Sequence, residues 1–573
     1  MSWTLKRRAQ ARVAGEEGAS RKEWGGRVSV ALVYPNTYAV GMSNLGFQTI
    51  YAHLNALPDA VCERVFFPDP EDLDEHLRTG TAPFSLESLR PLSDFDLVGF
   101  SVTYEGDYIN VVRLLQLAGI PARAADRDAS HPVVMMGGVC AFSNPEPLAP
   151  FMDFVAVGEG EELVGEIVSA YRESGAAREP GSRRAFLETL ARLGGIYIPG
   201  AYEVRHAADG TIAAVVPRAP GVPPVVAKRR LADVNRFETL SLLKTPRAEY
   251  GHMALLEVGK GCGRGCRFCL EGQIYRPVRH RSVAALRESV AQIAKGSRRV
   301  GLVGACVSDY PWIGDLLKVL EEQGVELSIS SLRADSLTEP LVASLARGGH
   351  RTLTMAPEAG TERLRLAIRK PITDEHLVAA CDLVRRHGIP NLKCYFMIGL
   401  PTETREDVEA IGDLAARLLR RLQVPGPDGH PFGRLTLSIS SFVPKPWTPF
   451  QWAPFEDHRA LEAKLDLIKR AVRRLSTVRV LHENPREAGL QALLARGDRR
   501  VADFVELAAT LGGDWRRALR EWDGDAAFYT RRPRPLDEVL PWDHFQVGVK
   551  KANLIKEWER AGLAVEGAMA WHA

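Results

Sequence analysis

The stretch LLEVGKGCGRGCRFC, residues 255–269, decides the fold of the central part of this chain. It opens on a short apolar run typical of a buried strand and continues into a loop that holds four glycines and three cysteines. Glycine tolerates positive φ and close backbone approach, so this composition allows a tight loop around a bulky group. The stretch therefore predicts a strand followed by a loop that presents the thiols of Cys262, Cys266 and Cys269.

Three closely spaced thiols indicate a metal centre. A [4Fe–4S] cluster normally takes four thiolates, so three would leave one iron open for a bound molecule. Structural zinc is the alternative, and a nearby fourth ligand would favour it. His252 and His280 are near in sequence but lack the usual close spacing to a second ligand pair. The spacing therefore favours the cluster.

Further apolar runs follow the triplet and alternate with helix-length segments. The expected strands are 254–259, 299–304, 326–331, 351–356, 392–398 and 434–441. Strands that alternate with helices predict an α/β fold, here a partial (β/α)6 barrel over 250–455. In such barrels the chemistry lies at the carboxyl ends of the strands, where the cysteines also fall.

The order Cys-x-x-x-Cys-x-aromatic-Cys, with Phe268 as the aromatic, resembles the radical S-adenosylmethionine (SAM) superfamily. The resemblance implies that the open iron chelates SAM through its amino and carboxylate groups. It also implies reductive cleavage to methionine and a 5′-deoxyadenosyl radical, with Cys262, Cys266 and Cys269 as the catalytic and metal-binding residues. An electron donor such as flavodoxin or ferredoxin would be a partner.

Two later strand ends match motifs of that superfamily. GLVGACVSD (301–309) takes the place of the family's Gly-Gly-Glu segment but departs from it, so backbone carbonyls near Gly304 would meet the SAM amino group. Ser331 and Arg333 end the third expected strand. Arg333 would pair with the methionine carboxylate, since guanidinium matches carboxylates; a surface salt bridge is the alternative.

Three more segments continue the resemblance. APEAGTERL (356–364) resembles the Glu-Ser-Gly segment, so Glu358 would bind ribose hydroxyls, or else serve as a helix N-cap. In KCYFMIGLPTET (393–404), Gly399 allows close approach to adenine. SISSFVPKPWTPFQW (438–452) resembles the last strand and exit loop of cobalamin-type radical SAM enzymes and of methylthiotransferases. There Lys445, flanked by Trp447 and Phe450, faces substrate, or the aromatics simply seal the barrel.

The residues before the barrel form a separate pattern. Short apolar runs alternate with helices over 27–174 and predict a doubly wound, Rossmann-like domain. Ligands of such sheets bind at the carboxyl ends of the strands. The expected lining is Tyr34–Gly41, Ser101–Asp107, Gly137–Ser143 and Gly158–Glu161.

The run from 137 to 162 resembles a segment of the cobalamin-binding radical SAM group, Gly-Gly … Asn-Pro-Glu-Pro-Leu … Asp … Gly-Glu-Gly-Glu. The resemblance implies that Gly137, Gly138 and Gly158 allow close approach to cobalamin. The motif Asp-x-His-x-x-Gly is missing after the first strand, and the similar spacing around His76 is a coincidence. We therefore expect a histidine-free corrinoid, with the loop from Tyr34 to Gly41 beneath it and Tyr34 or Tyr38 stacking. A vestigial domain without corrin is the alternative.

The remaining segments carry weaker signals. Residues 1–26 are expected to be a mobile lead-in without a secretory signal, 175–249 a linker region, and 456–573 a mostly helical third region. Net charge is +3, and no apolar run reaches the ~20 residues that span a bilayer. Eight cysteines, three of them clustered, fit a reducing cytoplasm. We expect no membrane association.

The leading function is cobalamin-dependent C-methylation of an unidentified substrate. RNA modification, such as methylthiolation, is the alternative enzyme; that family usually adds three N-terminal cysteines, and only Cys62 and Cys140 precede the barrel. A non-catalytic cobalamin or SAM sensor is the alternative from another class. Basic runs at 385–388, 417–421 and 496–500 suit nucleic acid but are more often solvated faces. Segments 101–121 and 540–551 resemble an uncharacterised bacterial group with this two-domain layout.

Overall fold

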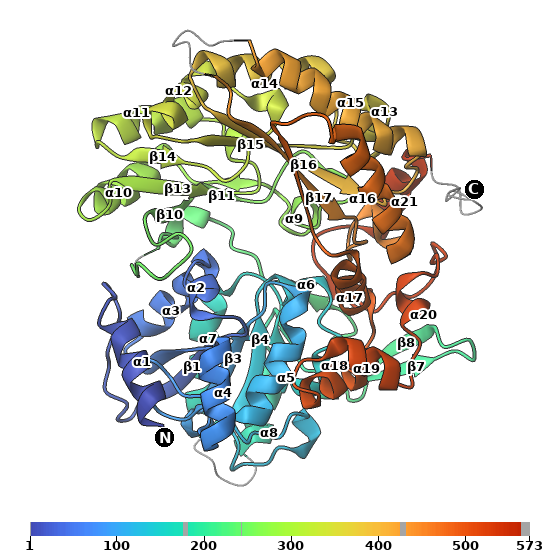
Figure 1. Cartoon of the computed structure of the whole chain (residues 1–573). Coiled ribbons are helices and arrows are strands. Elements are labelled where there is room, and N and C mark those ends of the chain that lie inside the picture. The colour runs from blue at the N-terminus through green and yellow to red at the C-terminus, as the bar shows by residue number, and fades with distance from the viewer. Residues whose placement is uncertain (1, 176–181, 242, 425–430, 563–573) are drawn as a thin grey trace. The chain divides into compact units, whose positions relative to one another are not determined.

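The computed structural model describes residues 2–175, 182–241, 243–424 and 431–562 (Figure 1). The chain divides into two compact units. The first contains 1–252, 493–526 and 537–547, and the second contains 253–492, 527–536 and 548–573. Each unit is an α/β structure, which confirms the fold class expected from the sequence. Among the described residues, no helix has both the length and the apolarity needed to cross a membrane.

The first unit is built on a six-stranded sheet in the order β2-β1-β3-β4-β5-β6. The strands are β1 (Val28–Tyr34), β2 (Ala60–Phe66), β3 (Leu97–Ser101), β4 (Val133–Gly137), β5 (Phe154–Ala156) and β6 (Ile196–Tyr197). The first five are parallel and β6 is antiparallel to β5. All seven residues of β1 are buried, because a central strand is covered on both faces.

Helices cover both faces of this sheet, as Figure 1 shows. They are α1 (Trp3–Val13), α2 (Tyr38–Gly41), α3 (Leu45–Ala56), α4 (Pro70–Thr79), α5 (Tyr108–Leu117), α6 (Val139–Ser143), α7 (Gly160–Glu173) and α8 (Ser182–Leu190). Helices α3 and α7 pack side by side, and α5 packs against α18 (Val501–Thr510). The doubly wound arrangement expected for 27–174 is therefore present.

The segment 1–26 differs from the expected mobile lead-in. Helix α1 buries Leu5, Ala9 and Val13 in the first unit. Beyond it, the carboxylate of Glu16 pairs with the guanidinium of Arg64 at 2.6 Å, and both side chains are fully buried. Periodic apolar residues and one buried ion pair therefore hold a segment whose overall composition is polar.

The expected linker and third region also differ from the structure. Within 175–249, α8, β6 and the hairpin of β7 (Tyr202–His206) and β8 (Ile212–Pro217) belong to the first unit, and residues 176–181 and 242 lie outside the described residues. The segment 456–573 is divided between the units. Its α18 and α19 (Trp515–Glu521) join the first unit, and β19 (Phe545–Gln546) pairs there with β9 (Val226–Ala227).

The second unit contains all six strands expected from the sequence, and β18 joins them in the same two sheets. They form two parallel sheets, β10-β13-β14 and β15-β16-β17-β18. A parallel bridge from Leu332 to Met355 connects the segment after β14 with β15. The strands are β10 (Ala254–Glu257), β13 (Arg299–Val303), β14 (Glu326–Ser328), β15 (Thr352–Glu358), β16 (Asn391–Ile398), β17 (Arg434–Ser441) and β18 (Val478–His482). Strand β18 lies in the region expected to be mostly helical.

Helices connect these strands along one side of the sheets (Figure 1). They are α10 (Val283–Ala294), α11 (Ile313–Glu322), α12 (Glu339–Arg347), α13 (Glu362–Ala367), α14 (Asp374–Arg386), α15 (Arg405–Leu422) and α16 (His458–Val472). Helix α15 begins at a capping box in which Thr404 and Asp407 satisfy each other's backbone N–H groups. Helix α21 (Lys551–Arg560) returns to this unit at the end of the described chain.

Candidate functional site

The three-cysteine loop leaves the carboxyl end of β10. Its base is closed by a two-stranded hairpin of β11 (Gly259–Lys260) and β12 (Arg279–His280). Gly261 has φ +84°, and a Cβ there would lie 2.4 Å from the carbonyl oxygen of Tyr275. Only glycine fits at this position, which explains part of the glycine-rich sequence.

Each thiol of the loop is near an N–H group. The backbone N–H of Arg264 lies 3.5 Å from Cys262 Sγ, and Arg333 Nη1 lies 3.8 Å from Cys266 Sγ. Burial raises the pKa of Cys269 to about 12, and a backbone hydrogen bond from Gly272 opposes that rise. N–H donors stabilise thiolate sulfur, so this donor set fits thiolate ligands of an iron–sulfur cluster.

The described residues contain no group of three His, Cys, Asp or Glu side chains placed to hold a single metal ion. The thiolates of a cluster bind different irons, so they do not have to converge on one point.

A chain of ion pairs lies beside the loop. Arg333 Nε and Nη2 donate to the two carboxylate oxygens of Asp335, at 2.9 and 2.8 Å. Asp335 also pairs with Arg264 Nη1 at 3.3 Å, and Arg264 makes two 2.6 Å bonds to Asp309. Arg333 is 7% exposed, so the salt bridge considered from the sequence is present but is buried and not at the surface. Its fork, expected to meet the SAM carboxylate, is occupied by Asp335.

Glu358 ends β15 with φ 71°, unusual for a residue with a side chain. Its carboxylate accepts a 2.7 Å hydrogen bond from Lys370. The N-cap of α13 is Thr361, whose side chain accepts from Leu364 N, so the N-cap alternative for Glu358 is wrong. Lys370 was missed by the sequence reasoning, although its charge lowers the pKa of Cys266 against the larger effect of burial.

Gly399 follows β16 with φ +83°. Its backbone N–H donates to both carboxylate oxygens of Glu403, at 3.0 and 3.1 Å. Glu403 is held by the buried ammonium of Lys464, which also binds Glu456, each at 2.7 Å. The loop expected to approach adenine is therefore held by a buried ion-pair network, and the backbone N–H of Gly399 already donates to Glu403.

Other predicted residues of this unit lie at the same strand ends. Gly304 follows β13, where a Cβ would lie 3.2 Å from Val258. Ser331 is exposed and Phe268 is half-buried. Cys306, in the segment after β13, is half-buried. Burial raises its pKa to about 12, and the charge of Cys262 adds a smaller rise.

The exit loop after β17 is mostly buried. Trp447 has φ 60° and is 5% exposed, and Phe450 packs edge-on against Phe442 and Trp558. Both aromatics therefore seal the structure, the second of the two roles considered. Lys445, between them and β17, is half-buried.

In the first unit the strand order reverses between β1 and β3. In sheets of the order 2-1-3-4-5, the ligand crevice lies outside the carboxyl ends of the strands at this switch point. The loops that follow β1 and β3 would therefore flank a ligand. They are joined by a 2.8 Å hydrogen bond from Asn36 Nδ2 to Asp107 and by one between the hydroxyls of Tyr34 and Thr103 at 3.0 Å.

Tyr34 and Tyr38 do not fit the stacking role expected from the sequence. Each is 4% exposed. Tyr34 packs edge-on against Phe47, and Tyr38 packs against Phe66 while its hydroxyl donates to Glu16. Both are core residues because α2 and α3 fold over the end of β1.

Most of the predicted glycines of this unit are required by the chain itself. Added Cβ atoms would lie 2.5 Å from Phe66 at Gly41, 2.5 Å from the Val102 carbonyl oxygen at Gly138, and 2.2 Å from the Arg229 carbonyl oxygen at Gly158. At Gly137 a Cβ would meet only Ala156, at 4.0 Å. Gly137 is therefore the one of the four that leaves open space.

Tyr104 and Asp107 were inside the expected lining but were not singled out. Tyr104 is 46% exposed, and its ring lies on Gly106, where a Cβ would come within 2.3 Å. Asp107 is 4% exposed. Burial raises its pKa to about 7, the hydrogen bond from Asn36 lowers it, and the charge of Glu105 raises it.

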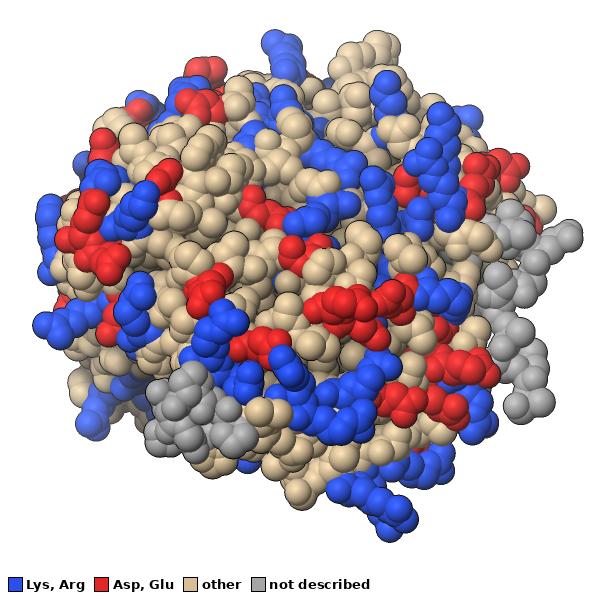
Figure 2. Space-filling model, turned by 90° about the horizontal axis from the view of Figure 1, so that it is seen from above, with Lys and Arg blue, Asp and Glu red and all other residues tan. Residues whose placement is uncertain are grey.

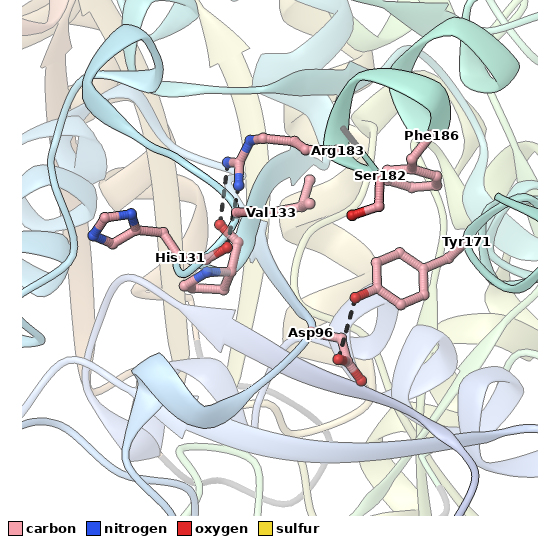
Figure 3. Close-up of a pocket in the computed structure, with 9 residues that line it drawn as sticks. Asp96, His131, Val133, Tyr171, Ser182, Arg183 and Phe186 are labelled. Atoms are coloured by element: carbon pink, nitrogen blue, oxygen red, sulfur yellow. Dashed lines mark hydrogen bonds between the residues drawn. The ribbon is translucent and has the colours of Figure 1, made fainter. Parts of the chain in front are cut away.

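Figure 3 shows a pocket at the amino ends of the strands of this sheet, opposite the switch-point loops. It is lined by residues just before β3 and at the start of β4, including Asp96 and Val133. Tyr171 donates to Asp96 and Arg183 donates to the Pro132 carbonyl, so the lining groups satisfy one another. It lies at the amino ends of the strands, away from the switch point.

The three basic runs are largely paired within the chain. Arg386 binds Glu339, Arg417 binds Asp374 and Arg421 binds Asp382. In the third run, Arg499 binds the buried carboxylate of Glu146 at 2.8 Å. Basic and acidic side chains are interspersed over the face shown in Figure 2. The preference against nucleic acid stays a prediction.

Comparison with known proteins follows the same division of the chain. A model described as "Radical SAM proteins, N-terminal" matches residues 46–199, and the radical SAM superfamily model matches 256–415. An uncharacterized protein of Methanocaldococcus jannaschii is 28% identical over 83% of this chain and 90% of its own length. An uncharacterized methyltransferase of Pyrococcus horikoshii is 23% identical over 57% of this chain and 65% of its own.

A solved structure shares the fold across both units. The radical S-adenosylmethionine methyltransferase TsrM of Kitasatospora setae, with tryptophan and a SAM analogue bound, aligns with a TM-score of 0.50 and 15% identity. The alignment covers 86% of this chain and 99% of that one. The two family models, placed on the two α/β regions, agree with the three-thiol loop at the carboxyl end of β10. The chain belongs to the radical SAM superfamily.

Proposed function

We propose that this radical SAM enzyme methylates carbon in a substrate, using SAM, a [4Fe–4S] cluster and a corrinoid. The observation that carries the proposal is the pairing, within one chain, of a three-thiol loop and a second α/β unit whose parallel sheet reverses its strand order between β1 and β3. When bound, the cluster supplies an electron to SAM and the corrinoid carries a methyl group. The names of TsrM and of the Pyrococcus relative, both methyltransferases, support this choice.

In the second unit the chain's own residues would hold the cluster and SAM at the strand ends. Cys262, Cys266 and Cys269 supply thiolates. Lys370 and Glu358, paired beside Cys266, offer a cation and a carboxylate for the polar parts of SAM, including its ribose. Gly304 and Ser331 flank the same edge. Since the Arg333 fork is occupied, the carboxylate of SAM would meet another donor first.

In the first unit the switch-point loops suit a large, flat and nearly neutral ligand. The ring of Tyr104 is 46% exposed and lies against Gly106. Gly137 leaves room at the end of β4. Protonation of Asp107 below a pH of about 7 removes one of the two negative charges in the loop after β3. We infer that Tyr104, in place of Tyr34 or Tyr38, lies against the corrin.

Anaerobic reconstitution followed by titration with hydroxocobalamin tests the proposal. We expect saturable binding with a shift of the corrin absorption bands, and transfer of a labelled methyl group from SAM once a substrate is supplied. Tyr104→Ala should weaken corrinoid binding about 2- to 10-fold, because an aromatic contact contributes about 0.5–1.5 kcal/mol beyond burial. Trp3→Ala, which removes a 68% exposed aromatic on α1, is the matched control.

Failure of corrinoid to bind under any reducing condition would refute the cobalamin part of the proposal. Iron content and SAM cleavage would then still report on the second unit. Equal affinity in wild type and Tyr104→Ala would instead move the corrin contact to another part of the edge.

A further inference from the structure

The contact between Arg333 and the sulfur of Cys266 has a role that the family resemblance does not assign. Nη1 of Arg333 lies 3.8 Å from Cys266 Sγ, in a part of the unit where both residues are buried. The sequence pointed to Arg333 as a ligand of SAM, but its other guanidinium edge is turned to Asp335. The remaining nitrogen is the one directed at a cluster ligand.

This orientation is fixed by a continuous series of ion pairs. Asp335 holds the Nε and Nη2 side of Arg333 in a two-point contact, and Arg264 binds Asp335 in turn. Asp309 binds Arg264 through both carboxylate oxygens. A guanidinium held at two points cannot turn away from the sulfur without breaking a buried pair, so the N–H donor is preorganised.

A charged N–H donor at a thiolate ligand has a definite electrostatic effect. When a low-potential donor adds one electron, negative charge on the cluster and its sulfurs increases. Hydrogen bonds to the sulfurs stabilise that added charge and are one of the factors that set cluster potentials. The effect is strong here because the site is buried and the local dielectric is low.

We propose that Arg333 is a positioning residue that donates a hydrogen bond to the Cys266 thiolate and thereby raises the reduction potential of the cluster. Asp335, Arg264 and Asp309 keep its donor in place. The inference goes beyond the proposed methyl transfer and does not depend on a corrinoid. It rests on the three-thiol site alone.

The test measures the potential directly. Wild type, Arg333→Met and Arg333→Lys are reconstituted without SAM or corrinoid, and each cluster is titrated against mediators while the EPR signal of the reduced form is followed. Arg333→Met should retain wild-type iron content and show a more negative midpoint potential. Arg333→Lys, which keeps a cation but loses the fork, should shift in the same direction by less.

Arg299→Met is the matched control. Arg299 lies at the amino end of β13, where it pairs with Glu326, so the same substitution there should leave the potential unchanged. Calorimetry with SAM measures separately whether Arg333 also contacts SAM, the role expected from the sequence. An unchanged potential in both Arg333 variants, with iron retained, would overturn the proposal. If Arg333→Met does not fold, Arg333→Lys decides: a negative shift supports the proposal and none overturns it.

Discussion

Non-glycine residues with positive φ are distributed unequally between the two units. Glu358, Arg369, Thr402 and Trp447 hold φ between 56° and 71° in the second unit. Glu358 is the last residue of β15, and the other three lie in loops. Among the described non-glycine residues of the first unit only Leu89 has a positive φ, and it lies outside the switch-point loops. Such conformations cost about 1–3 kcal/mol each and persist where the surrounding structure enforces them, often at active sites. The second unit therefore stores backbone strain at these four residues, whereas the described switch-point loops of the first unit do not.

Charge follows the same division. The second unit places three cations, Arg264, Arg333 and Lys370, around its cysteine loop, each paired with a carboxylate. The switch-point loops of the first unit are joined mainly by neutral groups, among them Tyr34 with Thr103. A charged, preorganised edge suits a polar ligand whose charge changes during reaction. A neutral, aromatic edge suits a carrier that is held and not activated there.

The largest expected effect is the loss of the cluster from the second unit, which should leave the first unit unchanged. Cys262→Ala, Cys266→Ala and Cys269→Ala should each reduce bound iron from about four atoms to nearly none and abolish 5′-deoxyadenosine formation. Cys394→Ala, at a fully buried thiol inside β16, is the matched control and should retain iron. Iron analysis and product quantification measure both.

If the cluster binds to the second unit and the corrinoid to the first, the same cysteine variants should still bind hydroxocobalamin with wild-type affinity. Retained SAM cleavage in any of the three variants would contradict the assignment of the thiols as cluster ligands.

Each unit also contains a buried cation between two carboxylates. Arg64 lies between Glu16 and Glu87 in the first unit, and Lys464 lies between Glu403 and Glu456 in the second. Replacing either cation by Met leaves two buried carboxylates without a counter-charge. We expect each variant to lose about 3–5 kcal/mol of unfolding free energy, measured by urea denaturation.

The two variants should differ in function. Glu403 holds the N–H of Gly399, so Lys464→Met should also weaken SAM binding, whereas Arg64→Met should not. Equal SAM affinity in both variants would show that the loop after β16 does not depend on this buried pair.

Sequence reasoning predicted the elements well where the pattern is local. Six strands of the second unit and the doubly wound sheet followed from apolar runs. The exact partners at the edges did not, because they depend on side chains brought together from distant segments. Arg264 and Asp335 are 71 residues apart, and Glu16 and Arg64 are 48 residues apart.

The glycines illustrate the same limit. Gly138 and Gly158 were interpreted as space for a ligand and Gly41 as part of the lining loop, but each fits against the chain itself. A glycine marks close approach without saying what approaches. Tyr104 was missed for the opposite reason: nothing in its local sequence distinguishes an exposed ring from the buried Tyr34 and Tyr38.

A smaller effect concerns the protonation of Asp107, in the switch-point loop after β3 of the first unit. The pKa of Asp107 is raised to about 7 in the folded protein, chiefly by burial, against about 3.9 when unfolded. The stability from the protonated carboxyl is therefore present below about pH 4 and is lost as the pH rises through 7. Asp107→Asn should match wild type near pH 4 and exceed it by more than about 1.4 kcal/mol at pH 8, the value of one pKa unit. Thermal denaturation across this range measures the difference; parallel curves would show that Asp107 is charged in the fold.

The smallest expected effect tests whether three thiols are enough. Cys306 lies three residues after the end of β13, and its sulfur lies 3.6 Å from the Ser308 hydroxyl. Burial raises the pKa of Cys306, and the charge of Cys262 adds a smaller rise. We expect Cys306→Ala to retain about four irons and SAM cleavage, with a loss of no more than about 1 kcal/mol in unfolding free energy, since only a weak contact is removed. Cys381→Ala, at a buried thiol in α14, controls for the loss of a thiol elsewhere in the unit. Lost iron or SAM cleavage in Cys306→Ala alone would make Cys306 a fourth ligand. The iron assumed to be open to SAM would then be closed by the protein, and the functional contrast between the two edges would fail.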